Sequence, residues 1–308
     1  MYLALFGLVA CSIAEEAPSA TSTVKSPVPT ATSRPTPRIA EVIVSRPSEL
    51  AEVIPTIPLP GREVLSTEHF AFYVQDNYRP VDVTRWATIA EDIYSEVSTD
   101  LGADSPDVII LSFHPPDDRT CPARGSAFYT DPGPRMLIYA DDQTEESQIL
   151  GVLAHELVHI IHMTGFNRPL SGDPGLNEGL ATWITREYWT AWHQTESLPQ
   201  MIRAYLAEET YVPLAEAAVF GVYPQAQDIT PTDCLAQRDL LYSQWAGFVG
   251  YLVDTYGWEP FVDLMATAAS EVTDEGEILP SPTDYEGIYG KTLETLEAEW
   301  LAQLQGSS

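Results

Sequence analysis

The stretch SQILGVLAHELVHIIHMTG, residues 147–165, decides how the rest of the chain is interpreted. It is apolar at most positions, yet it carries His155, Glu156 and His159 in the order His-Glu-x-x-His. Residues four apart share one face of a helix, so the two histidines can direct ring nitrogens to one metal ion, and Glu156 can reach a water molecule there. Burial of these three groups without partners would be costly. The spacing therefore predicts a metal-binding helix with Glu156 as general base.

The residues after this motif distinguish two classes of zinc hydrolase. A catalytic zinc ion normally takes three protein ligands and leaves a fourth position for water. The metzincin pattern requires glycine and then histidine at the positions that His162 and Gly165 occupy, so the chain departs from it. His162 lies on roughly the same helix face as His155, two turns away. It is the alternative ligand, and we interpret it as a packed histidine near the site.

A glutamate in the next segment is the candidate third ligand. The sequence NEGLA, residues 177–181, places Glu178 19 residues after His159. Glycines and prolines between them break the first helix, and the Asp-Pro pair at 173–174 has the form of an N-cap followed by proline at the first helical position. We therefore expect one zinc ion per chain, bound by His155, His159 and Glu178.

HELVH followed by NEGLA at this spacing resembles the gluzincin clan, with the interval of the aminopeptidase N type of zinc peptidase. Those enzymes carry a tyrosine in the region where this chain has Tyr242, 64 residues after Glu178. Residues 66–303 also resemble the small bacterial peptidase MA-like domains. The resemblance implies hydrolysis of a peptide or protein substrate, with Tyr242 as donor to the developing oxyanion. The alternative for Tyr242 is an ordinary tyrosine beside the apolar stripe of its helix.

One segment departs from the aminopeptidase pattern. Those enzymes hold the free substrate amine with a Gly-x-Met-Glu-Asn motif, whereas residues 125–130 read GSAFYT and lack the glutamate. The resemblance therefore does not imply specificity for a free amino terminus, and the sequence does not decide between endo- and exopeptidase. Residues 136–140, MLIYA, are the candidate edge strand for pairing with an extended peptide, and a purely structural edge strand is the alternative.

The expected secondary structure changes along the domain. Strands rich in β-branched and aromatic residues are expected at 69–74, 107–113 and 135–140, around a helix at about 81–101. Helices are expected afterwards at about 145–164, 175–190, 198–208, 237–256, 259–270 and 291–305. This order predicts an α+β fold. With the resemblance, it implies a small N-terminal β-sheet with helices, followed by a mostly helical, thermolysin-like gluzincin subdomain.

The N-terminal residues indicate export. Residues 1–11 form a short apolar segment ending in Leu-Val-Ala-Cys, which resembles the lipobox of bacterial lipoproteins, although no Lys or Arg precedes it. Residues 12–60 are rich in Pro, Ser and Thr and are expected to form a linker, and residues 61–308 are expected to form the peptidase-like domain. We expect an exported lipoprotein on the extracytoplasmic face of the membrane, anchored through a lipid on Cys11.

The net charge limits the binding partners of the chain, and the cysteine content raises the question of a disulfide. The net charge of -30 makes nucleic acid a poor partner, so none is expected. Cys121 and Cys234 remain once Cys11 is assigned to lipid, and an oxidising compartment would allow them to form a disulfide. Two buried free thiols are the alternative. The sequence does not determine the oligomeric state.

Zinc-dependent peptide hydrolysis is the leading functional hypothesis, and two others stay open. The first is a surface lipoprotein whose zinc site is structural or metal-binding and which acts in adhesion or as a scaffold. Glu156 disfavours it, because a structural site needs no general base and normally closes its fourth coordination position. The second is a zinc hydrolase acting on a non-peptide bond, since the same chemistry serves other substrates.

Overall fold

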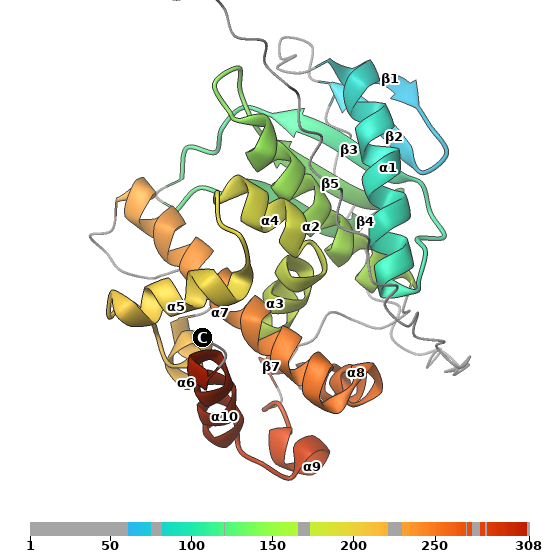
Figure 1. Cartoon of the computed structure of the whole chain (residues 1–308). Helices are drawn as coiled ribbons and strands as arrows, with labels where there is room; N and C mark the ends of the chain where they lie inside the picture. The colour runs from blue at the N-terminus through green and yellow to red at the C-terminus, as the bar shows by residue number, and fades with distance from the viewer. Residues whose placement is uncertain are drawn as a thin grey trace, which may run out of the picture. The chain divides into compact units, whose positions relative to one another are not determined.

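The computed structural model describes a β-sheet that is followed along the chain mainly by helices (Figure 1). The described residues are 61–74, 82–119, 121–165, 173–220, 230–268, 270–272, 278–280 and 282–306. The predicted signal segment, the lipid site at Cys11 and the linker of residues 12–60 lie outside this part of the chain. Within it, no helix is long and apolar enough to cross a membrane. The α+β class expected from the sequence is confirmed.

The main sheet has five strands in the order β1-β2-β3-β5-β4. The strands are β1 (Arg62–Ser66), β2 (Phe70–Val74), β3 (Ile109–His114), β4 (Gly125–Thr130) and β5 (Gly133–Tyr139). Strands β2, β3 and β5 run parallel to one another, whereas β1 and β4 pair antiparallel with β2 and β5. A second sheet pairs β6 (Ser270–Val272) with β7 (Ile278–Pro280).

The prediction of an edge strand at residues 136–140 is wrong. Met136 pairs with Leu111 of β3 on one side and with Ala127 of β4 on the other, so β5 lies inside the sheet. The edge strands of this sheet are β1 and β4, and β4, which pairs with β5, was not identified as a strand from the sequence. The chain reverses after Thr130 and β5 returns along β4, which places the more polar strand on the outside.

One helix, α1, follows the first two strands, and the other described helices follow the main sheet along the chain. They are α1 (Val83–Leu101), α2 (Glu146–Gly165), α3 (Pro174–Ile184), α4 (Arg186–Trp192), α5 (Leu198–Ala207), α6 (Leu214–Phe220), α7 (Pro231–Tyr256), α8 (Trp258–Thr267), α9 (Tyr285–Tyr289) and α10 (Leu293–Gly306). Two of the expected helices differ clearly from the structure. The helix expected at 175–190 is divided at Thr185, and α7 begins at Pro231 because Thr230 caps it, before the start expected at 237.

Helix α2 is the central element of the core. Every residue from Gly151 to His162 is buried, because α2 packs against β4 and β5 on the sheet and against α1, α3 and α4. Alternate side chains of β3, such as Ile109, Leu111 and Phe113, are also almost fully buried in this core. A helix that is apolar on nearly all sides belongs inside a protein. The polar residues in this buried part of α2 are therefore held in an environment with little water.

Helix α3 approaches α7 closely at its glycines. A methyl group on Gly179 would lie 2.8 Å from the backbone oxygen of Trp245, and one on Gly175 would overlap the Trp245 ring. The small residues let the two helix backbones come together, which fixes α3 between α2 and α7 (Figure 1). Glu178 lies on this short helix, so its position is set by both neighbours.

Candidate metal centre

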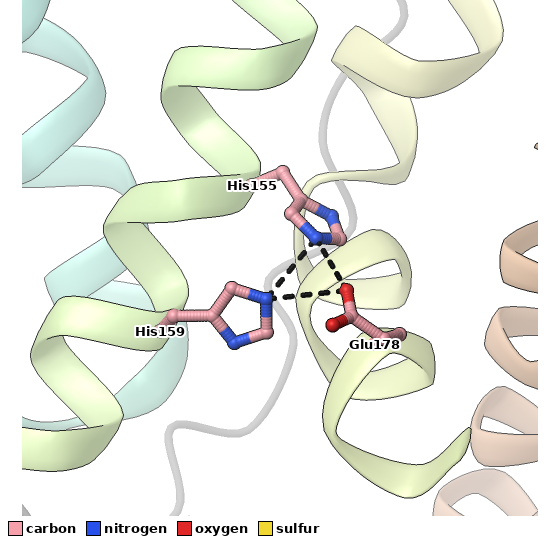
Figure 2. Close-up of side chains that lie close together, drawn as sticks. All are labelled: His155, His159 and Glu178. Atoms are coloured by element: carbon pink, nitrogen blue, oxygen red, sulfur yellow. Dashed lines mark hydrogen bonds and ion pairs between the residues drawn. The ribbon is translucent and has the colours of Figure 1, made fainter. Parts of the chain in front are cut away.

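Three side chains converge on one point between α2 and α3 (Figure 2). His155 Nε2 lies 2.9 Å from Glu178 Oε2, and His159 Nε2 lies 3.1 Å from His155 Nε2 and 3.3 Å from Glu178 Oε2. Ligands of a tetrahedral zinc ion with bonds of about 2.0–2.1 Å are about 3.3 Å apart. The three atoms thus already have nearly the separation that the ion requires, and the donor set of two imidazoles and one carboxylate suits zinc.

The local sequence explains why these groups meet. His155 and His159 are one turn apart on α2 and point the same way (Figure 2). Asp173 caps α3 by accepting hydrogen bonds from the backbone N–H groups of Gly175 and Leu176, as the Asp-Pro pair predicted. The cap starts α3 early enough to place Glu178 opposite the histidines. All three predicted ligands are brought together, and among the described residues His162 is not part of this group.

A hydroxyl on α3 contacts the far side of the His155 ring. Thr182 Oγ1 lies 3.2 Å from His155 Nδ1 and is fully buried. A partner at Nδ1 orients the ring and leaves Nε2 directed at the metal position, as is usual for histidine ligands. The sequence analysis did not identify Thr182. Its position one helical turn after Glu178, in NEGLAT, was the available signal, because it puts both residues on one face of α3.

Burial and mutual charge set the protonation of the ligands. Burial lowers the pKa of His155. For His159, burial acts in the same direction, but the Glu178 carboxylate outweighs it and the pKa is raised. Burial would raise the pKa of Glu178, yet the charge of His159 and the hydrogen bonds to both histidines bring it well below its ordinary value. The carboxylate is therefore ionised, as a metal ligand must be.

Glu156 lies beside the ligands and is almost fully buried. Burial raises its pKa to about 8, with Glu178 adding to the rise and His159 opposing it. Edge strand β4 contacts it closely, since a methyl group on Gly125 would lie 2.5 Å from Glu156 Oε1. The side chain is thus confined between α2 and β4, on the cavity that the ligands also line.

Tyr242 of α7 reaches the same cavity. Its ring stacks on the His155 ring, with centroids 5.4 Å apart and an interplanar angle of 5°. Burial and then the charge of Glu178 raise the pKa of Tyr242 well above its ordinary value, so the hydroxyl keeps its proton. The structure therefore places Tyr242 with the predicted site residues, as a neutral hydrogen-bond donor.

The cavity at the three ligands has a volume of about 310 Å³. Its walls come from β4 and the residues before it, from α2, α3 and α4, and from α7. The sequence analysis did not identify four prominent wall residues: Arg124, Trp189, Trp192 and Arg238. No pattern in the sequence marks them, since they come from segments that only the fold brings together.

A disulfide joins two of these segments. Cys121 precedes β4 and Cys234 lies in the first turns of α7, with a sequence separation of 113 and their Cα atoms 5.6 Å apart. The sequence left pairing and two free thiols open, and the structure has the pair. Arg238, one turn after Cys234, donates hydrogen bonds to Cys121 Sγ at 2.8 Å and to the Pro122 carbonyl at 2.7 Å. The disulfide therefore connects the β4 wall of the cavity to the α7 wall.

Comparison with known proteins does not assign the chain to a family. No protein-family model matches the chain, and no curated protein is significantly similar to it in sequence.

Proposed function

We propose that the chain is a zinc-dependent peptidase of gluzincin type. The observation that carries the proposal is the convergence of His155, His159 and Glu178 with nearly tetrahedral ligand spacing, beside a buried glutamate on one cavity. The thermolysin-like character of the helical region and the likeness to peptidase MA-like domains are part of this proposal. They rest on the HELVH and NEGLA motifs and their spacing.

Each residue at the cavity has a role in this reaction. His155, His159 and Glu178 would hold the zinc ion, which when bound would supply a Lewis acid for the scissile carbonyl and for water. Glu156 takes a proton from the attacking water and gives it to the leaving nitrogen. Tyr242 keeps its proton and donates a hydrogen bond to the oxygen on which charge develops. Thr182 holds the ring of His155 in place.

The edge strand suggests how an extended peptide would bind. Residues Gly125, Ser126 and Ala127 of β4 line the cavity, and β5 is the one strand that pairs with β4 among the residues that the structure describes. A peptide lying along β4 would extend the sheet and bring a backbone carbonyl to the ligands. The peptide-pairing role expected for residues 136–140 is therefore assigned to β4. This mode of binding requires no free amino terminus.

The proposed location is the outer face of the cell membrane, through a lipid on Cys11. The Cys121–Cys234 disulfide supports an oxidising compartment, where such bonds persist. An adhesive lipoprotein with a structural zinc site is the alternative, as is a hydrolase of a non-peptide bond. The open cavity beside the ligands and the buried Glu156 favour catalysis over a structural site, because they leave room for substrate and supply a base.

Metal analysis combined with peptide-library cleavage tests the proposal. The full chain is expected to hold about one zinc ion and to cleave peptides, and Glu156→Gln is expected to keep the zinc but lose activity about 10²-fold or more. Glu145→Gln, an exposed change just before α2, is the matched control and should retain activity. Full hydrolysis by zinc-loaded Glu156→Gln would overturn the assignment. A zinc-loaded chain that cleaves no peptide in the library would favour the two alternatives.

A further inference from the structure

A third aromatic ring lies beside the stacked pair of His155 and Tyr242. The ring centroid of Trp189, on α4, is 6.2 Å from that of His155 and 6.1 Å from that of Tyr242. Aromatic pairs with centroids about 4.5–7 Å apart attract each other, so the three rings form one contact group. Tyr242 therefore has two ring neighbours, one on the helix of the histidine ligands and one on α4.

Trp189 is anchored to α7 at the residue next to Tyr242. Its indole Nε1–H donates a hydrogen bond to Ser243 Oγ at 2.9 Å, and Ser243 Oγ donates in turn to the Asp239 carbonyl at 2.7 Å. The Trp192 ring packs nearly perpendicular to the Trp189 ring, with centroids 5.2 Å apart. Trp189 is buried, with 3% of its surface exposed. A buried ring with a hydrogen-bonded N–H group and close aromatic neighbours has little freedom to move.

The place of the Tyr242 hydroxyl depends on how its ring is held. Helix α7 fixes the backbone of Tyr242, but the side chain can rotate about its χ1 and χ2 bonds, so its neighbours select the orientation. The hydroxyl is at the far end of the ring, so a tilt of the ring displaces the hydroxyl oxygen more than the ring carbons. A misplacement of about 1 Å in an active site costs about 10²-fold in rate. Contacts that fix this ring therefore matter for any reaction that uses the hydroxyl.

We propose that Trp189 is a positioning residue, which holds the Tyr242 ring so that its hydroxyl reaches the oxygen on which charge develops. The proposal rests on the proposed function, because Tyr242 has this task only in that reaction. Trp189 has no acid-base group at neutral pH and acts through Tyr242. The anchor on Ser243 makes α4 a third helix, beside α2 and α7, that sets the geometry of the reacting groups.

A double-mutant cycle of Trp189→Leu and Tyr242→Phe tests this role. In the wild-type background, Trp189→Leu should lower kcat about tenfold, with zinc content unchanged and KM altered less than about threefold. In the Tyr242→Phe background, which has no hydroxyl to position, the same change should lower kcat less than about twofold. An equal loss in both backgrounds would overturn the proposal. Trp189 also lines the cavity, so a change confined to KM would indicate direct contact with substrate and would contradict positioning.

Further variants separate positioning from loss of the fold. Trp300→Leu removes a tryptophan of α10 whose exposed fraction is also 3%. It should lower the thermal unfolding midpoint but keep kcat within about twofold, because this ring packs elsewhere in the core. Trp189→Phe keeps an aromatic ring and should lose less kcat than Trp189→Leu.

Ser243→Ala replaces Trp189→Leu if the latter does not fold. It keeps the indole ring and removes the acceptor of its N–H group. It should lower kcat at least about threefold, and again less than about twofold in the Tyr242→Phe background. Wild-type kcat in this variant would then refute the role of the anchored ring.

Binding of a transition-state analogue gives a readout without turnover. The probe is a phosphinic peptide matched to a sequence that the wild-type protein cleaves, in which a tetrahedral phosphinate replaces the scissile amide. Calorimetry on zinc-loaded protein should show that Trp189→Leu weakens binding about tenfold, but less than about twofold in the Tyr242→Phe background. Equal dissociation constants for wild type and Trp189→Leu would contradict the proposal.

The outcomes separate the inference from the proposed function. A wild-type protein that takes up no zinc or cleaves no peptide refutes both. A protein that cleaves peptides, depends on Glu156 and shows a Trp189 effect independent of Tyr242 refutes the role of Trp189 alone, as does full activity of Tyr242→Phe.

Discussion

Replacement of Gly125 by alanine tests the position of Glu156, the proposed general base. The added methyl group would lie 2.5 Å from Glu156 Oε1, 2.7 Å from Glu156 Cγ and 2.6 Å from Val152 Cγ1. Ordinary contact begins at 3.4 Å, so either the carboxylate or strand β4 has to move by about 0.9 Å, the difference between 3.4 and 2.5 Å. A misplacement of about 1 Å in an active site costs about 10²-fold in rate. We expect kcat/KM of Gly125→Ala to fall by about that factor.

Measurement of zinc content and of thermal unfolding beside kcat/KM separates this effect from loss of the metal or of the fold. The three atoms nearest to the added methyl group belong to Glu156 and Val152 and not to the three candidate ligands, so zinc content and the thermal unfolding midpoint should stay near the wild-type values. Ser126→Ala is the matched control, because it alters the next residue of the same strand and adds no atom near Glu156. It should retain kcat/KM within a few-fold. A zinc-loaded Gly125→Ala protein within about threefold of wild type would refute the role assigned to Glu156 and β4.

Four further predictions concern the ligands and their surroundings. Tyr242→Phe should lower kcat about 10²-fold at unchanged zinc content, measured by steady-state kinetics. Thr182→Val should weaken zinc binding about 10–100-fold in a chelator competition, because it removes the contact with the histidine ligand. Zinc at about 100 times its dissociation constant should raise the free energy of unfolding by about 2.7 kcal/mol, and His159→Ala should abolish this gain in thermal unfolding. Reduction of Cys121–Cys234 should lower that free energy by roughly 2–5 kcal/mol in denaturant titrations; an unchanged midpoint would contradict a stabilising role for the disulfide.

The convergence of the three candidate ligands could be predicted because its geometry is mostly local. His155 and His159 are related by one helical turn, and this relation follows from the period of the α-helix alone. The prediction of Glu178 required one further step, which is the start of a second helix at Asp173-Pro174. Capping residues also act locally, so this start could be read from the sequence. The expected ligands therefore lie together in the structure. Tyr242 was harder to place, since its contact with His155 depends on how α7 crosses the site.

The cavity walls could not be predicted because they depend on contacts distant in sequence. The segment GSAFYT, residues 125–130, ends in three residue types that are common in strands, but it begins with a glycine and two small residues and shows no clear alternation of apolar and polar positions. Its pairing partner β5 defines it as a strand and as the sheet edge. Arg238 reaches the site through its contact with Cys121, across a sequence separation of 117. Neither relation is marked by a period or a motif in the chain.

The burial of Glu156 makes its function dependent on the charges around it. A carboxyl group with a pKa of about 8 is mostly protonated at neutral pH and accepts a proton poorly. A divalent cation at the adjacent ligands would favour the ionised form and lower this pKa, and the charge of Arg238 acts in the same direction. The cation would thus serve twice, once on the substrate carbonyl and once by keeping the general base ionised. In the proposed mechanism, the apolar surroundings of α2 would therefore couple the competence of Glu156 as a base to occupation of the metal centre, which a solvent-exposed glutamate would not do.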